Sequence, residues 1–545
     1  MEETVPKVLL RTDSINLGAE KNISLSFTDV FKKISGLALP MGMSFTFSFE
    51  VFLAVILLQN LSESEDDTAA AALVSVLMNS VCVLAMAPLF AVAINLSGKL
   101  GAWREYKKED KIVNDDSSNE YDETREKEKI ESANINSLLI ASAVTVPSAL
   151  ILYYSKPLLT SVFGQNDAVA SSAAKFLEVY SFAVPGLMAR MALEQVMFSF
   201  GKSKPAMWMA LGSLAIGAPL SILLGFGVKS ESLQIPKMGQ RGVALGFLIE
   251  SYLTAISYGF FVKFNKECRE FDFYKTSIKK ICDNLDGAKE ILRLGGSIAF
   301  TVGIELSLTL AIGVFSGLLG TKEQSAMSYN MQFIYFEFIM LAAFSFSCTQ
   351  EISREKGANK LENAQKIAKY GLLTTLIYLT PIPVFFAIYP KALEAISGGA
   401  SKDISDQLTT LVPIMCSGVI LDAVRYNLLQ QSRALDDLFV PNTIALLGMS
   451  SGIGLAAGLG LGTSLNIDGV GMGYTIGLGV TAGAMALRWR SKVKELFPEK
   501  DDEKCWGIGN PFAFFSPTRE KNSSVVEEIT DGVSPDELPT SPLLY

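Results

Sequence analysis

Four carboxylates stand inside apolar segments of this chain, at spacings that pair them across its two halves. Glu50 and Glu305 are 255 residues apart, and Glu194 and Asp422 are 228 residues apart. A carboxylate at the centre of a membrane-spanning helix costs on the order of 3 kcal/mol, so such residues usually bind an ion or a substrate. We therefore predict that these four acids contribute to the cation- or substrate-binding site of a transporter.

Glu50 and Glu305 have no lysine or arginine within one helical turn along the chain. Because no local cation balances them, we expect a proton or a bound cation to neutralise each carboxylate. Sodium is one such cation, and we expect its site to lie at Glu305 and Asp422. A structural hydrogen bond to a neighbouring helix is the alternative interpretation of these acids.

Glu194 and Asp422 differ from the first pair because each has an arginine on its own helix face. Arg190 precedes Glu194 by four residues, and Arg425 follows Asp422 by three. Residues three and four apart are neighbours on a helix, so both acids are expected to form local ion pairs. Asp422 also lies in a segment dense in polar groups, which favours a functional role for it.

A fifth acid, Glu337, has Tyr335, Gln332 and Asn330 within two helical turns. These side chains either line a cavity or face partner helices, and the spacing fits both arrangements. Glu337 is therefore a further candidate for cation or substrate binding.

The absence of histidine restricts the chemistry that this chain can perform. With no histidine among 545 residues, protons inside the membrane must be carried by carboxylates, tyrosines or water. No Ser-His-Asp triad can form, and no phosphate-binding loop of the G-x-x-x-x-G-K-[ST] type occurs. The sequence predicts a protein that is not an enzyme, has no cofactor or metal centre, and uses an H⁺ or Na⁺ gradient rather than ATP.

The composition indicates a membrane protein. Hydrophobic residues make up 49% of the chain, charged residues only 19%, and the mean hydropathy is +0.32. A helix needs ~20 apolar residues to cross a bilayer. We mark twelve such segments, at 34–58, 69–97, 136–155, 168–200, 206–228, 242–263, 294–319, 325–350, 366–389, 406–430, 439–462 and 469–490.

Motifs repeat between the two halves of this pattern. Gly-Ala follows span 2 at Gly101 and span 8 at Gly357, and Gly-Val opens span 6 at Gly242 and span 12 at Gly469. Lysine and arginine are concentrated in alternate connections, which places both termini in the cytoplasm. Six helices repeated in the same orientation form a parallel repeat. The predicted fold is an all-α integral membrane protein with 12 transmembrane helices in two pseudo-symmetric six-helix lobes.

The domain boundaries follow from the spans. A run of alternating charges between spans 2 and 3 has no apolar face and is expected to be a solvated, partly disordered insertion. The polar tail is also expected to be disordered. The predicted parts are a cytoplasmic N-terminal segment 1–29, the N-lobe 30–264 with the insertion 104–136, a cytoplasmic linker 265–293, the C-lobe 294–494 and a cytoplasmic tail 495–545.

Taken together, the span order, the two motif pairs, Glu305 in span 7 and Asp422 in span 10 resemble the multidrug and toxic compound extrusion (MATE) family over roughly residues 30–490. The resemblance implies export of organic, often cationic, compounds in exchange for Na⁺ or H⁺ through a V-shaped pair of lobes. It also implies that Glu305 and Asp422 bind cations or contact substrate.

The partners expected are small organic substrates and membrane lipid, without nucleic acid. We expect a monomer in the plasma or inner membrane. Two alternatives remain at this point. A lipid-linked oligosaccharide flippase of the same superfamily would need arginines such as Arg190 and Arg425 for its pyrophosphate. A membrane scaffold or sensor that does not transport would not need Glu305.

Overall fold

The computed structural model describes residues 25–48, 50–62, 65–113, 120–229, 234–271, 273, 285–396 and 402–496. The helices of both halves of the chain, as far as Lys492, belong to one compact unit. In the described ranges the secondary structure is helical, apart from a two-stranded antiparallel ribbon of β1 (Val228–Lys229) and β2 (Gln234–Ile235).

The first half contains twelve α-helices within the described ranges, with short π- or 3₁₀-helical segments between some of them. The helices are α1 (Phe27–Phe47), α2 (Glu50–Leu61), α3 (Glu65–Met78), α4 (Leu84–Met86), α5 (Phe90–Val113), α6 (Glu120–Tyr153), α7 (Ser155–Pro157), α8 (Asp167–Tyr180), α9 (Val184–Ser199), α10 (Ser203–Phe226), α11 (Gln240–Phe264) and α12 (Lys266–Arg269). The short segments are η1 (Asn79–Val83), η2 (Ala87–Leu89), η3 (Leu158–Val162) and η4 (Ser181–Ala183).

The second half repeats this arrangement with longer, less interrupted helices. They are α14 (Leu285–Leu319), α15 (Thr321–Gly357), α16 (Leu361–Leu379), α17 (Pro381–Ile388), α18 (Pro390–Ile396), α19 (Lys402–Ala434), α20 (Phe439–Gly462) and α21 (Asn466–Leu496).

The all-α membrane class is confirmed. Within the described ranges, eleven helices are long and apolar enough to cross a bilayer, and they match the second to twelfth predicted spans. The first predicted span, 34–58, is divided between α1 and α2, and residue 49 between them lies outside the described residues. Glu50 is the first residue of α2, and its side chain also lies outside the described set.

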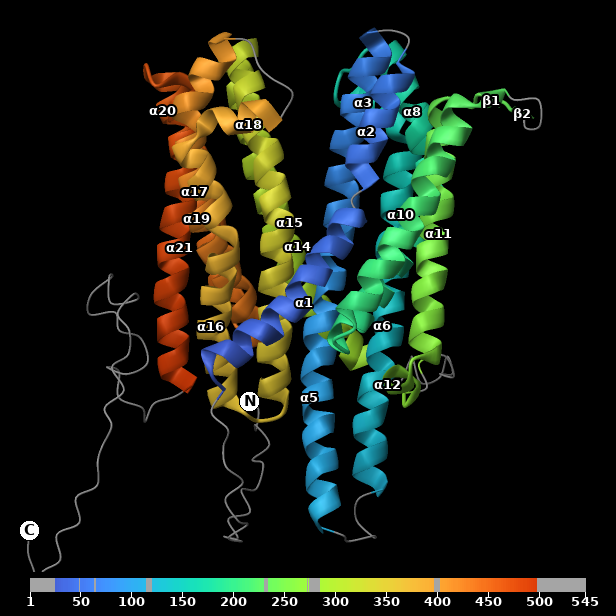
Figure 1. The fold of residues 1–545 in the computed structure, drawn as a ribbon, viewed down its shortest axis with the longest axis vertical. Coiled ribbons are helices and arrows are strands. Elements are labelled where there is room, and N and C mark those ends of the chain that lie inside the picture. Colours follow the sequence, from blue (N-terminus) through green and yellow to red (C-terminus); the bar gives the residue numbers. More distant parts are fainter. Residues whose placement is uncertain are drawn as a thin grey trace, which may run out of the picture. The chain divides into compact units, whose positions relative to one another are not determined.

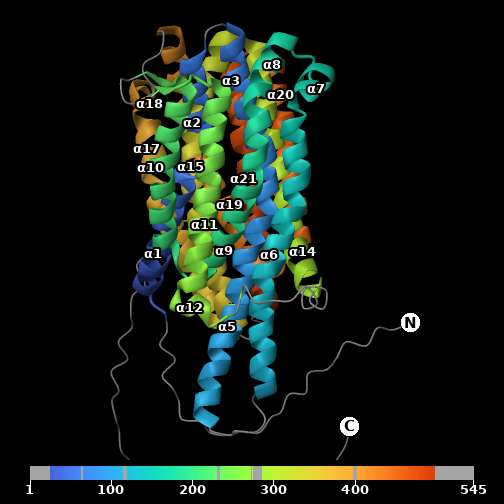
Figure 2. The same cartoon turned by 90° about the vertical axis from the view of Figure 1, so that its right-hand side faces the viewer.

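Contacts between helices follow the internal repeat. α1 packs against α10 of its own half and against α15 and α16 of the other. α14, its counterpart, packs against α20 of its own half and against α5 and α6 of the other. Figure 1 shows α1 crossing diagonally from one group of helices to the other, and Figure 2 shows the same bundle from the side. The first helix of each half therefore packs against both halves.

The repeated Gly-Ala motif has a packing explanation. A Cβ on Gly101 of α5 would lie 2.0 Å from the carbonyl oxygen of Arg354, and a Cβ on Gly357 of α15 would lie 1.9 Å from that of Gly98. Both distances are far inside van der Waals contact, so only glycine permits this approach. The motif thus marks the crossing of α5 and α15, where the two halves meet.

The Gly-Val motif closes a helical hairpin in each half. A Cβ on Gly242 would lie 2.2 Å from the carbonyl oxygen of Leu224, and a Cβ on Gly469 would lie 2.4 Å from that of Leu459. The α10–α11 and α20–α21 pairs therefore pack through equivalent glycines, which is why these residues recur at a fixed spacing.

The described parts of the predicted insertion 104–136 are helical, and its residues 114–119 lie outside the described residues. Its described residues continue α5 as far as Val113 and begin α6 at Glu120. Charged side chains pair along α6, where Lys127 Nζ lies 3.9 Å from Glu131 Oε1. Ile130 and Ala133 are nevertheless fully buried in the hydrophobic core, so this part of α6 has an apolar face that the run of charges concealed in the sequence.

Candidate functional site

The site is organised around Arg425, which is buried in α19 with 1% of its side chain exposed. Its Nε donates to Asp422 Oδ1 at 2.5 Å, one turn earlier on the same helix. Its Nη2 donates to Glu305 Oε1 at 3.0 Å, and Glu305 is supplied by α14. One guanidinium therefore serves two carboxylates from two different helices.

This geometry confirms one expectation and corrects another. The local pair of Asp422 with Arg425 is present as the spacing predicted. Glu305 has no basic neighbour within one turn of its own helix, and a proton or a bound cation was expected to neutralise it; instead Arg425, which is 120 residues away in sequence, reaches it from another helix. The error arose because helix spacing reports only neighbours on the same helix. A sodium ion shared by Glu305 and Asp422 would have to adjoin a guanidinium that already joins them.

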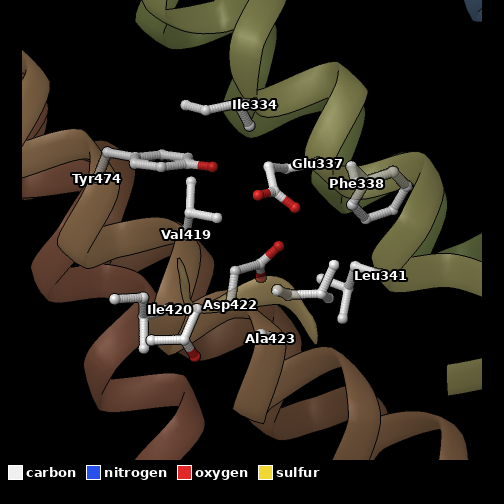
Figure 3. A pocket seen from close by; sticks show the side chains of 11 residues that line it. Ile334, Glu337, Phe338, Leu341, Val419, Ile420, Asp422, Ala423 and Tyr474 are labelled. Carbon is white, nitrogen blue, oxygen red and sulfur yellow. The ribbon is translucent and has the colours of Figure 1, made fainter. Parts of the chain in front are cut away.

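Glu337 faces Asp422 across a narrow pocket between α15 and α19. Figure 3 shows the two carboxylates directed toward one another, with the hydroxyl of Tyr474 from α21 pointing toward Glu337. Glu337 is 3% exposed, and its Oε1 accepts no hydrogen bond from any described residue. The free volume is about 10 Å³, which is about the space that one water molecule requires.

The remaining walls of the pocket are largely apolar. Among the described residues that line the pocket, Thr380 and Tyr474 are the other polar ones. The rest are apolar: Ile334, Phe338, Leu341, Leu379, Val419, Ile420 and Ala423. A carboxylate surrounded by apolar and aromatic side chains can bind an organic cation, because the carboxylate attracts the positive charge and the walls contact the apolar surface. In this conformation the pocket admits a proton or a water, and a larger molecule would need the walls to move apart.

Sequence analysis did not single out Arg433, a second arginine of this cluster. Arg433 is 1% exposed, and its Nη2 donates to Thr301 Oγ1 at 2.5 Å and to the carbonyl oxygen of Ser297 at 3.4 Å. It stands two turns after Arg425 on α19, so it lies on the same face of that helix. Its position eight residues after Arg425, about two helical turns, is the feature of the sequence that could have identified Arg433 as a member of the cluster.

Glu194 belongs to a separate cluster in the first half. Its Oε1 accepts hydrogen bonds from Ser44 Oγ at 2.5 Å and from the Tyr258 hydroxyl at 3.4 Å, which connects α9 to α1 and α11. Arg190 donates through Nη2 to the carbonyl oxygen of Ser48 at 3.2 Å, where α1 has just ended. Among the predicted acids whose side chains are described, Glu305, Asp422 and Glu337 thus lie in the second half and Glu194 in the first, and the described residues include no cluster of three or more metal-ligating side chains.

Comparison with known proteins agrees with this architecture. The MatE family model matches residues 124–223 and 297–457. The "Probable multidrug resistance protein NorM" of Pseudomonas putida is 24% identical over 367 residues, which cover 66% of this chain and 77% of that protein. Its namesake in Pseudomonas aeruginosa is 22% identical over 66% of this chain and 74% of its own length.

Solved structures show the same fold. The eukaryotic MATE transporter AtDTX14 superposes with a TM-score of 0.71 at 19% identity, covering 86% of this chain and 98% of its own. An outward-facing multidrug resistance MATE transporter of the MOP superfamily gives a TM-score of 0.73 at 14% identity, covering 87% and 97%.

Proposed function

Because the chain belongs to the multidrug and toxic compound extrusion family of transporters, we propose that it exports organic cations across its membrane in exchange for protons. The observation that carries this proposal is the distribution of charge in the second half. Arg425 balances charge on Glu305 and Asp422, whereas Glu337 Oε1 has no hydrogen-bond donor among the described residues. A buried carboxylate of this kind is ready to take up a positive charge.

The donor set favours a proton over sodium as the coupling ion. Sodium is a hard cation that needs several oxygen ligands at once. The pocket offers the carboxylates of Glu337 and Asp422, the hydroxyl groups of Tyr474 and Thr380, and about 10 Å³ of free volume. A proton needs only one oxygen and no free volume, so Glu337 can bind it in this arrangement.

The transport cycle then follows because the proton and the organic cation compete for the negative charge of Glu337. When Glu337 is ionised, the pocket has a net negative charge that attracts an organic cation. When Glu337 is protonated, the attraction is lost and the substrate is released. The two states bind the substrate with different affinity, which is the requirement for a proton gradient to drive its movement.

We further propose that both termini lie in the cytoplasm and that the described conformation opens away from it. The lysine-rich connections are on the side where α5, α15 and α1 join the two halves. On the other side α2 and α3 pack on α8, α10 and α11 of their own half. Figure 1 shows α3 and α18 at the same end of the molecule, in different groups of helices.

The test is transport by purified protein in proteoliposomes. A panel of small organic cations is offered under an imposed pH gradient, an imposed Na⁺ gradient, or neither. We expect uptake against the concentration gradient only with the pH gradient, and loss of it in Glu337→Gln. Transport driven by Na⁺ alone would overturn the choice of ion, and no transport of any cation would overturn the function.

The flippase alternative is disfavoured by the two arginines on which it depends. Arg425 is committed to Asp422 and Glu305, and Arg190 donates to the backbone at the end of α1. Binding a pyrophosphate would require both to leave buried partners. A non-transporting scaffold is distinguished by the same proteoliposome assay, because it would give no uptake under any gradient.

A further inference from the structure

The two halves also meet through an ionic cluster that the transport site does not use. It comprises Lys33 of α1, Glu351 and Arg354 of α15, and the carbonyl oxygen of Ser199 at the end of α9. We propose that this cluster, centred on Glu351, is a latch that holds the cytoplasmic ends of the two halves together and sets the balance between outward-open and inward-open states. The inference rests on the proposed transport function for its place in a cycle.

Glu351 is held by a cation from each side of the boundary. Lys33 Nζ, from the first half, lies 2.5 Å from Glu351 Oε2, and Arg354 pairs with Glu351 Oε1 from one turn along the same helix. The Glu351 side chain is 0% exposed, while Lys33 remains 38% exposed. A carboxylate so fully buried depends on its cations, because removing one partner of a buried pair is strongly destabilising.

Arg354 makes the second connection across the boundary. Its Nη2 donates to the carbonyl oxygen of Ser199 at 2.6 Å. Ser199 is the last residue of α9, so this carbonyl is one of those that a helix leaves unpaired at its negative end. The guanidinium thus binds a carboxylate of its own half and a helix terminus of the other half.

Neighbouring contacts hold the same boundary. Ser353 Oγ donates to the carbonyl oxygen of Ile94 at 2.7 Å, and Lys360 Nζ donates to Glu105 Oε2 at 2.6 Å. The close crossing of Gly101 with Arg354 lies between them. Opening toward the cytoplasm must break this whole set, and Glu351 is the buried charge that gains most water when it does.

The internal repeat shows that this crossing can form without a carboxylate at the position of Glu351. The Gly-Ala offset of 256 residues carries Glu351 onto Asn95 and Arg354 onto Gly98. At these two equivalent positions the first half has an amide and a glycine, and its charged contact nearby is the pair of Lys99 with Glu290. For this reason Glu351→Gln is expected to fold, and its effect should appear in the equilibrium between conformations.

The experiment measures distances across the boundary in the full-length protein. Cys282 and Cys505 are replaced by serine, and spin labels are attached to cysteines introduced at the exposed positions Lys108 of α5 and Glu362 of α16. The four described cysteines are buried and should not react. Double electron–electron resonance then reports the fraction of molecules whose cytoplasmic ends have separated.

We expect Glu351→Gln to raise the ratio of separated to joined molecules about tenfold or more, since loss of a buried ionic partner exceeds the ~1.4 kcal/mol that corresponds to tenfold. Lys33→Met should act in the same direction, and the double variant should add little to Glu351→Gln. The control is Asp437→Asn, which breaks the ion pair of the buried Asp437 with the partly exposed Arg488 inside the second half and should leave the distances unchanged.

Unchanged distances in Glu351→Gln would overturn the latch even if transport fell. Separation in Glu351→Gln would support the latch even if no substrate were transported, and in that case only the transport proposal would fail. A shift of equal size in Asp437→Asn would also overturn the latch, because it would show a general loosening of the protein.

Discussion

Replacement of Arg425 by methionine tests whether one arginine balances two acids. Its guanidinium lies 2.5 Å from Asp422 and 3.0 Å from Glu305. Arg425→Met leaves both carboxylates without their cation inside the bundle. Asp422→Asn leaves Glu305 with its partner, and Glu305→Gln does the same for Asp422. The three single variants should therefore differ in stability, although all three remove a charge from the same cluster.

The size of the effect follows from burial. Removing one partner of a buried ion pair costs about 3–5 kcal/mol. For a folded unit of several hundred residues the unfolding entropy is on the order of 1 kcal/mol per degree. Arg425→Met should then lower Tm by about 3–5 °C. Each single acid variant should lower it by about 1 °C or less, since the arginine keeps one partner.

Thermal unfolding in detergent, followed by circular dichroism, measures these shifts. The triple variant Glu305→Gln, Asp422→Asn, Arg425→Met leaves no member of the shared ion pairs charged, so it should recover most of the Tm lost in Arg425→Met. Equal losses in Arg425→Met and Asp422→Asn would refute the reasoning. That result would mean that the pair is local to α19, as helix spacing alone suggests, and that the contact with Glu305 has no energetic weight.

Three further outcomes are expected. Glu305→Gln should weaken ion-coupled export, because Arg425 then balances Asp422 alone and the pocket attracts a cation less strongly; the protein should still elute as a folded species in size-exclusion chromatography, and unchanged gradient-driven transport would show that Glu305 has no part in this charge balance. Glu337→Gln should abolish coupling to the pH gradient without lowering Tm, because an amide needs no counter-charge in the buried pocket; a wild-type coupled rate would contradict this. Gly101→Ala should lower Tm by about 1–3 °C through overpacking, since its Cβ would lie 2.0 Å from a backbone oxygen, whereas Gly296→Ala, with nothing within 4 Å, should not.

Much of the architecture could be predicted from the sequence because its signals are local. The length of an apolar run reports a membrane span, and eleven of the twelve predicted spans reappear as helices. The exception is the first span, which is divided between α1 and α2. Glycines recur where two backbones touch. The motifs at Gly101 and Gly357 therefore indicate the repeat from the sequence alone, and the crossing of α5 and α15 explains why both positions are glycine.

Of the site, the acids and the local partner of Asp422 could be predicted from the sequence, but the contacts between helices could not. The spacing of Asp422 and Arg425 lies within one helical turn and is decided by the helix itself. The pairing of Arg425 with Glu305 joins α19 to α14, and that of Lys33 with Glu351 joins the two halves. No periodicity along the chain encodes such contacts.

Interactions between neighbours along the chain therefore account for the membrane helices, their repeat and the presence of costly charges within them. Which of these charges neutralise one another depends on how the helices pack. Helix formation and membrane insertion depend on neighbours along the chain, whereas the free energy of a buried charge depends on whatever surrounds it in space. That is why Glu305, which has no cation nearby in sequence, shares Arg425, and why Glu337 has a carboxylate oxygen that accepts no hydrogen bond from the described residues.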